Sequence, residues 1–404
     1  MLKSMLILMR GTVVAQGIGF AVLPLLTRLF TPADFGVLQL YQSIMAVLMV
    51  IATFRFEIAI LRAETAKELK AVLILCALIN FIISVLLFVI AVILYLTGWK
   101  FGDTYPSYLI WCLPIAFLIN GTMQYVTFWL TRDKAFGQSS NGKIAQALGY
   151  VSTASASGLV NSGGIGLIAA DIVSKLFSLI YSANWCRNKW QTLGLFPSWH
   201  RIKAIAWKFR EFPFVAVPGG LVNCFGGIMT PVMIYATFSA NVSGQFGLVE
   251  RSLTLPIGII IASVSQVFSA QISEALRQNS SEGRRLFHRY AILLFAVGIV
   301  PAIILTLAAP ELFKLLFGPQ WALAGQFAAI IAPAYCLMLV SGGTNMILML
   351  LGMQKTQMAW EIGRLAAMAG LWAFAQHQNW TATQAVFGHT IILAITSISF
   401  LALA

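Results

Sequence analysis

The chain has 404 residues, of which 59% are hydrophobic and only 10% are charged. Soluble domains carry about 25% charged residues, so this composition excludes an ordinary soluble protein and indicates a membrane protein. The net charge of +13 does not indicate a nucleic-acid partner, because the basic residues lie in short segments between apolar stretches and form no long basic tract.

Apolar stretches of about 18 residues or more recur along the chain, and each is long enough to cross a hydrocarbon core of about 30 Å. Arg10 interrupts the first stretch and no small-residue cleavage site follows, so we expect no cleavable signal peptide. The pattern predicts an all-α polytopic membrane protein with about 12 transmembrane helices. The expected spans cover roughly residues 10–30, 39–61, 69–96, 106–130, 139–160, 163–185, 213–239, 246–272, 288–309, 321–351, 357–376 and 383–403.

The basic residues predict the orientation of these spans. Most of the 26 Lys and Arg residues lie on the side of the membrane that holds the N-terminus, whereas Arg28, Lys100 and Lys314 lie on the other side. The positive-inside rule therefore places the N-terminus in the cytoplasm, and an even number of spans places the C-terminus there too. The outer loops are too short for a folded domain of about 50 residues.

The two halves of the chain resemble each other weakly. Phe-Gly pairs occur at matching places in both halves, and their order predicts two six-helix bundles, residues 1–196 and 213–404, related by pseudo-two-fold symmetry about the membrane normal. The matching pairs are Phe35-Gly36 with Phe246-Gly247, and Phe101-Gly102 with Phe317-Gly318.

Residues 197–212, between the two halves, have an amphipathic pattern at helical spacing. The segment is too short and too charged to cross the membrane. We predict a linker helix that lies in the inner-leaflet interface, and a soluble linker helix is the alternative. Its apolar face consists of Trp199, Ile202, Ile205, Ala206, Phe209 and Phe212.

The segment from Leu23 to Glu64 carries the most specific motifs. Residues 31–36 predict a compact turn, with Thr31 capping the next helix and Pro32 in its first turn. The run Leu-Pro-x-x-Thr-Arg-x-Phe-Thr-Pro-x-Asp-Phe-Gly at residues 23–36, together with Phe-Arg-Phe-Glu-x-Ala-Ile at residues 54–60, resembles the first two helices of the bacterial polysaccharide repeat-unit flippases. These O-antigen and capsule transporters belong to the multidrug/oligosaccharidyl-lipid/polysaccharide exporter superfamily.

The resemblance implies a function. Such proteins move polyprenyl-diphosphate-linked oligosaccharide repeat units across the bacterial inner membrane by alternating access, for O-antigen, capsule or exopolysaccharide synthesis. It implies the lipid-linked glycan and the bilayer as partners, with a polysaccharide polymerase and the chain-length machinery as further candidates.

Three alternatives stay open at this point. A cation-coupled multidrug antiporter of the same superfamily usually carries an acidic residue in its first helix, and residues 10–30 contain none. A flippase for cell-wall precursor lipid fits the same pattern. A membrane polysaccharide polymerase is less favoured, because it needs a substantial periplasmic loop for its chemistry.

Charged residues within the spans are the candidate site residues, because charges at membrane depth are costly and usually face a cavity or a partner. The cations suit phosphate oxygens, and the acids suit coupling or helix pairing. The alternative is that each acid and cation form a neutralised structural pair. The candidate substrate-binding residues are Arg28, Arg55, Lys175, Arg251 and Arg364, and the candidate acids are Glu57, Asp171, Glu250 and Glu361.

Helix-breaking residues predict hinges in matching first helices of the two halves. They are Pro24 in the first span and Pro218, Gly219 and Gly220 in the seventh. The sequence has no P-loop, and its four histidines and five cysteines have no metal-ligand spacing. We therefore expect a transporter and not an enzyme, without a cofactor or a metal site.

Overall fold

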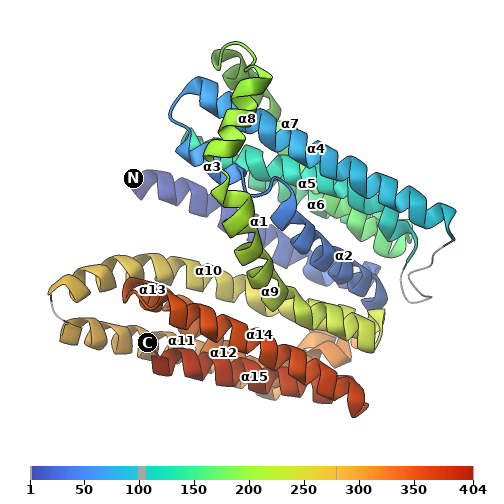
Figure 1. The fold of residues 1–404 in the computed structure, drawn as a ribbon. Helices are drawn as coiled ribbons and strands as arrows, with labels where there is room; N and C mark the ends of the chain where they lie inside the picture. The colour runs from blue at the N-terminus through green and yellow to red at the C-terminus, as the bar shows by residue number, and fades with distance from the viewer. Residues whose placement is uncertain (1, 99–105, 279, 404) are drawn as a thin grey trace. The chain divides into compact units, whose positions relative to one another are not determined.

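A computed structural model of the chain describes residues 2–98, 106–278 and 280–403, where every regular element is helical (Figure 1). The expected repeat element Phe101-Gly102 lies outside these residues. The α-helices are α1 (Leu2–Leu29), α2 (Pro32–Ile51), α3 (Glu57–Arg62), α4 (Ala66–Leu96), α5 (Tyr108–Arg132), α6 (Phe136–Leu159), α7 (Gly163–Thr192), α8 (Trp199–Lys208), α9 (Val217–Thr237), α10 (Ala240–Gln278), α11 (Ser280–Phe317), α12 (Ala322–Gly343), α13 (Ile347–Leu350), α14 (Gln354–His377) and α15 (Ala382–Leu403). A π-helical turn, Phe212–Ala216, leads into α9, and a 3₁₀ turn, Pro319–Trp321, leads into α12.

Within the described residues, ten helices are long and apolar enough to cross a membrane. Two expected spans, 139–160 and 357–376, coincide with α6 and α14, which are not among the ten. Both have 24 residues, so their length suffices, and their polar side chains are what lower their hydropathy. The prediction of an all-helical, multi-pass membrane protein is confirmed, whereas the count of 12 spans and the two-bundle symmetry stay predictions.

The chain divides into two compact units, Met1–Ile228 and Met229–Ala404, with the boundary inside α9. The division expected from the sequence, 1–196 and 213–404 with a separate linker, was based on repeats and stays a prediction.

The turn between α1 and α2 has the predicted cap. Thr31 Oγ1 accepts a hydrogen bond from the Asp34 backbone N–H, and Asp34 Oδ2 accepts one from the Thr31 backbone N–H at 2.9 Å. This reciprocal capping box satisfies two donors at the start of the helix. Pro32 occupies the first turn, as predicted.

In the N-terminal unit, α6 packs against both α1 and α7. Small residues allow this close packing, as is common between membrane helices. A Cβ added to Gly158 would lie 2.8 Å from Leu29 Cβ on α1, and one added to Gly149 would lie 2.8 Å from the Phe177 ring on α7. Glycines of α6 therefore let both of its neighbours approach closely.

The linker helix α8 has the expected amphipathic pattern, but its apolar face contacts protein. Ile202, Ile205, Phe209 and Phe212 are buried in a cluster with residues of α3, α4 and α5. Protein therefore covers most of the apolar stripe, which the sequence could not predict, because periodicity shows that a face is apolar but not what covers it. Trp199, at the end of the stripe, is exposed. The location of the helix at the inner-leaflet interface stays a prediction.

In the C-terminal unit, α12 is the central helix and packs against α10, α11 and α15. Gly325 lets α12 approach the backbone of α11, because a Cβ there would lie 2.6 Å from Pro310 Cα. His389 on α15 is 3.1 Å from Thr230 Oγ1 on α9, so this histidine takes part in a side-chain contact between helices.

Candidate functional site

The second expected span is broken where its two charges lie. The helix α2 ends at Ile51 and α3 begins at Glu57. Between them Phe54 and Arg55 adopt positive φ angles of 47° and 63°. Residues with a side chain rarely adopt this left-handed conformation, which is unfavourable unless the surroundings hold it. The backbone between α2 and α3 is therefore locally strained, at the place where Arg55 and Glu57 lie.

Glu57 is completely buried at this break. Its carboxylate accepts a hydrogen bond from the Thr53 hydroxyl, and Glu57 Oε1 accepts another, 2.8 Å long, from Gln124 Nε2 on α5. Arg55 Nη1 lies 3.8 Å from the same oxygen. On a continuous helix, residues two apart point in nearly opposite directions, which would keep these two charges apart. The break before α3 instead brings them within 3.8 Å.

The Arg55 side chain is 29% exposed and runs past α9. A Cβ at Gly220 would lie 2.6 Å from Arg55 Nη2, so a glycine leaves the space that the guanidinium needs. Arg55 Nε is buried and has no hydrogen-bond partner among the described residues. At 3.8 Å the contact with Glu57 is longer than a hydrogen bond, so it balances charge without using a donor. The Arg55 guanidinium is thus positively charged, partly exposed and left with unused hydrogen-bond donors.

A second charged cluster joins α7 to α2 in the same unit. Lys175 Nζ lies 2.5 Å from Asp171 Oδ2, one helical turn away, and the Tyr41 hydroxyl donates a 3.0 Å hydrogen bond to the same oxygen. Tyr41 is fully buried, and both charged side chains are mostly buried. The arrangement has the features of the neutralised structural pair that the sequence left as the alternative.

The C-terminal unit places its candidates on α10 and α14. Arg364 Nη2 lies 2.8 Å from Glu361 Oε2, and the guanidinium also lies over the Trp360 ring at 5.4 Å from its centroid. Both charged side chains are roughly one-third exposed. Glu250 and Arg251 are half-buried on α10.

The remaining candidates are Arg28 and the hinge residues. Arg28 is exposed near the end of α1 and has no ion pair within the described chain. Pro24 lies inside the continuous helix α1. Pro218, Gly219 and Gly220 lie in the first turn of α9, directly after the π-helical turn. Such turns occur often at functional sites. The roles of all these residues stay predictions.

Arg55, Glu57 and Gly220 are all candidates from the sequence, but no sequence pattern predicts that they lie together. Thr53 and Tyr41, which bond to the two acids, were not predicted. Gln124 lies within the expected span 106–130, where a polar residue suits either sugar hydroxyls or an interhelical hydrogen bond. Its bond to Glu57 is of the interhelical kind.

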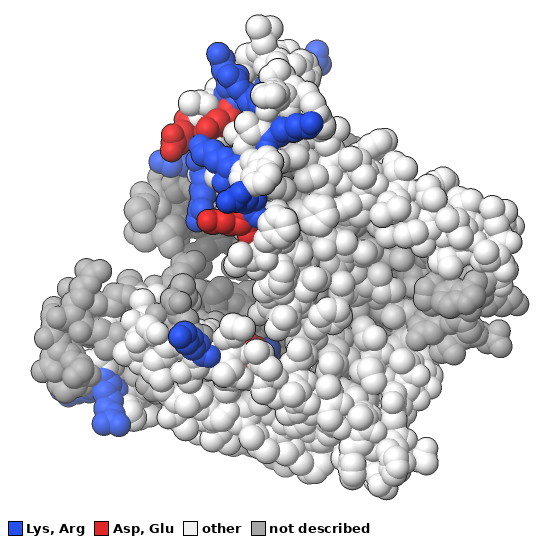
Figure 2. Space-filling view, viewed as in Figure 1, with Lys and Arg blue, Asp and Glu red and all other residues white. Residues whose placement is uncertain are grey.

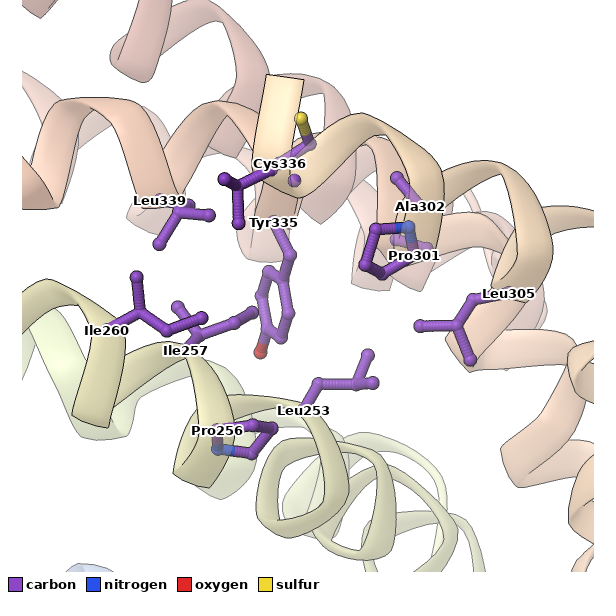
Figure 3. A pocket seen from close by; sticks show the side chains of 13 residues that line it. Leu253, Pro256, Ile257, Ile260, Pro301, Ala302, Leu305, Tyr335, Cys336 and Leu339 are labelled. Atoms are coloured by element: carbon purple, nitrogen blue, oxygen red, sulfur yellow. The ribbon is translucent and has the colours of Figure 1, made fainter. Parts of the chain in front are cut away.

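An apolar cavity of about 170 Å³ lies within the C-terminal unit. Helices α10, α11 and α12 line it, and the Tyr335 ring points into it beside Leu253 and Ile257 (Figure 3). None of its lining residues is charged, so the cavity suits hydrocarbon and does not suit a phosphate group.

Charged side chains gather around α8 and the adjoining ends of α3 and α4 in the N-terminal unit, whereas the flank beside them is nearly free of charge (Figure 2). Within this region Lys208 Nζ lies 2.8 Å from Glu68 Oε1. The hydrogen bond that Lys208 donates to the Glu68 carboxylate raises the pKa of Lys208 above its usual value. The pair ties α8 to the start of α4.

The chain has the fold of known membrane transporters. A structure of the lipid II flippase MurJ aligns with a TM-score of 0.70 and 10% identity, covering 100% of this chain and 87% of that one. A transporter of the MOP superfamily from Pyrococcus furiosus aligns with a TM-score of 0.59 and 12% identity, covering 99% and 94%. A structure of an inward-facing multidrug resistance MATE family transporter aligns with a TM-score of 0.57 and 12% identity, covering 98% of this chain and 93% of that one. At such low identity these likenesses show the fold alone.

A search of curated protein sequences gives no match. The sequence model of a family described as "Polysaccharide biosynthesis protein" matches residues 25–325, which is most of the chain. The matched region contains both motifs on which the sequence-based resemblance depends, apart from Leu23 and Pro24. The chain belongs to this polysaccharide biosynthesis family and has the fold of the MOP-superfamily transporters and flippases.

Proposed function

We propose that this protein moves polyprenyl-diphosphate-linked oligosaccharide repeat units across the bacterial inner membrane, for O-antigen, capsule or exopolysaccharide synthesis. Membership of a polysaccharide biosynthesis family and the transporter fold support this proposal. The physical task is to carry sugars and a diphosphate through hydrocarbon, where unpaired polar and charged groups cost many kcal/mol. The prenyl chain can stay in the lipid, so the protein needs a polar route only for the head of the substrate.

Arg55 is the observation that carries the proposal. A guanidinium with unused donors suits a diphosphate, because its planar fork can bond two phosphate oxygens at once. Glu57 keeps this cation at a low cost within the membrane, since it supplies a compensating charge without occupying the fork. Thr53 and Gln124 in turn hold the Glu57 carboxylate in place.

Arg28, Lys175, Arg251 and Arg364 are further candidates for contact with the substrate, and Asp171, Glu250 and Glu361 for coupling or helix pairing. Lys175 and Arg364 each already face an acid at hydrogen-bond distance. A phosphate would have to compete with that acid, so Arg55 is favoured over these two residues as the phosphate ligand.

Transport in this proposal occurs by alternating access. The break beside Arg55 and the π-helical turn before α9 provide two irregular backbone segments. Gly220 brings the break into contact with the first turn of α9, so a change at the hinge of Pro218, Gly219 and Gly220 would move the groups around Arg55. Pro24 is a second candidate hinge. Both termini lie in the cytoplasm, and a polysaccharide polymerase and chain-length machinery are candidate partners.

A translocation assay on the full chain in proteoliposomes tests the proposal. A fluorescent polyprenyl-diphosphate-linked oligosaccharide is compared with a fluorescent cell-wall precursor lipid and a fluorescent phosphatidylcholine, and a membrane-impermeant quencher reports the probe in the outer leaflet. We expect protein-dependent translocation of the oligosaccharide lipid and none of phosphatidylcholine. Faster movement of the cell-wall precursor would support that alternative, and uptake of a cationic dye against a proton or sodium gradient would support an antiporter.

A further inference from the structure

A cavity of about 390 Å³ lies beside the linker, within the N-terminal unit and apart from Arg55. The first turn of α4 forms one wall, and the loop after α7 together with the start of α8 forms the other. The cavity is partly open to the surface, and its lining residues belong to the region around α8 in which charged side chains gather (Figure 2). Its lining residues are Lys67, Leu195, Phe196, Pro197, Ser198 and Arg201.

Two cations face this cavity from opposite walls. Neither Lys67 nor Arg201 has an ion pair within the described part of the chain. Of the acids adjacent in sequence, Glu64 lies three residues before Lys67, ahead of α4, and Glu68 is engaged by Lys208 at 2.8 Å. The cavity therefore presents two basic groups that no acid within 4 Å neutralises, and an anion between them would interact with both.

The start of α8 adds to the positive character of the cavity. Ser198 is the N-cap of this ten-residue helix, its side chain makes no capping hydrogen bond, and the first turn holds no acidic residue. The N-terminus of a helix carries a partial positive charge that favours an anion, and the N-cap of α8, Ser198, lines the cavity with Lys67 and Arg201.

The walls are held in place before any ligand binds. Lys70 on α4 is buried and donates a 2.5 Å hydrogen bond to the carbonyl oxygen of Gly194. Its ammonium also lies 4.8 Å from the centre of the Trp190 ring and 4.6 Å from that of Phe196. These cation–π contacts fix the loop on the α4 side, and the Lys208–Glu68 pair fixes α8.

The rim of the cavity is apolar and exposed. Leu195 is 93% exposed and Phe196 is 74% exposed, and Trp199 and Trp207 on α8 are also largely uncovered. Large apolar side chains at the edge of a basic surface are typical of segments that insert into the boundary between headgroups and acyl chains. A soluble anion would gain nothing from them, whereas the chains of a lipid would cover them.

We infer that this cavity binds the phosphate of an anionic phospholipid from the cytoplasmic leaflet, with its acyl chains running along Leu195 and Phe196. Charge selects an anionic headgroup over a zwitterionic one, because a choline or ethanolamine cation would lie beside Lys67 and Arg201. The bound lipid holds the linker segment against the membrane while the apolar stripe of α8 stays packed on α4.

Native mass spectrometry of the purified full chain tests this site by its retention of phosphatidylglycerol and phosphatidylcholine. Lys67→Gln combined with Arg201→Gln removes both cations. The matched control, Lys203→Gln combined with Arg210→Gln, removes two exposed charges from the same segment that do not line the cavity. We expect the cavity variant to bind phosphatidylglycerol roughly 10-fold more weakly, and the control to change less than about 3-fold. If the cavity variant fails to fold, Arg201→Gln alone is used, with an expected loss of about 3-fold.

Four results would overturn the inference. If the cavity variant and the control lose equal affinity for phosphatidylglycerol, binding depends on the overall surface charge and not on the cavity. If the wild-type chain retains phosphatidylcholine as well as phosphatidylglycerol, apolar contacts alone explain the binding. Displacement of phosphatidylglycerol by inorganic phosphate at similar concentration would show a site for free anions. Tighter binding of polyprenyl diphosphate, lost with the same two cations, would assign the cavity to the transported lipid.

Discussion

Gln124 Nε2 on α5 donates a 2.8 Å hydrogen bond to the buried carboxylate of Glu57, and this bond holds the acid that faces Arg55. Two residues that are 67 positions apart in the sequence thus form one polar contact at the broken span. The contact gives Glu57 a structural role that can be separated from any role in transport.

The first prediction concerns Glu57 itself. Glu57→Ala removes the acceptor of two hydrogen bonds and leaves Arg55 without its counter-charge, so it should lower the free energy of unfolding by about 2 kcal/mol. Glu57→Gln keeps the shape and one acceptor, and its effect should be smaller. The melting temperature in detergent measures both effects. Glu64→Ala is the control, because Glu64 is exposed and lies in the same region. Equal melting temperatures for Glu57→Ala and Glu64→Ala would contradict a structural role.

The second prediction concerns Asp171 and Lys175. Asp171→Ala should reduce the amount of folded protein, because it leaves Lys175 without an acid and Tyr41 without its acceptor. Asp171→Asn combined with Lys175→Gln should largely restore it, as measured by monodisperse protein after detergent extraction. If the double variant folds well but does not transport, the pair has a role beyond stability.

The third prediction uses adjacent glycines as a matched pair. Gly220→Ala places a methyl group within 2.6 Å of Arg55 Nη2, whereas Gly219→Ala has no atom within 4 Å to meet. The end of the arginine side chain can move aside, so stability should change little, but the guanidinium would be displaced. We expect lower transport for Gly220→Ala at equal protein level and near-normal transport for Gly219→Ala. Equal activities would show that the position of Arg55 against α9 does not matter.

The fourth prediction concerns topology and follows from the distribution of basic residues. Reporter fusions should place the loops after Arg62, Arg132, Trp199 and Arg285 in the cytoplasm, and those near Asp34 and Gly318 in the periplasm. A periplasmic signal at Trp199 would contradict both the topology and a lipid site in the cytoplasmic leaflet.

Local features of this chain could be predicted from the sequence because their signals lie within one helical turn. The Thr31 cap and the Asp171–Lys175 pair are of this kind, since their partners are three and four residues apart. Long apolar stretches likewise predicted the multi-pass fold, because length and composition alone decide which helices can cross a bilayer.

The geometry around Arg55 could not be predicted in this way. No proline or glycine marks residues 52–56, and the groups that contact the break, Gln124 and Gly220, come from distant helices. The same limit applies to α8. Its pattern showed an apolar face, but only the tertiary structure shows that α3, α4 and α5 cover it.

The most direct test of the proposed function is the translocation of polyprenyl-diphosphate-linked oligosaccharide by Arg55 variants in proteoliposomes, matched for protein. Arg62→Ala is the control, because Arg62 is a nearby exposed arginine whose guanidinium lies over Phe212. We predict that Arg55→Ala abolishes translocation, that Arg55→Lys keeps part of it because the charge stays but the fork is lost, and that Arg62→Ala is near normal. Wild-type translocation by folded Arg55→Ala would contradict the assignment of Arg55 as the phosphate ligand.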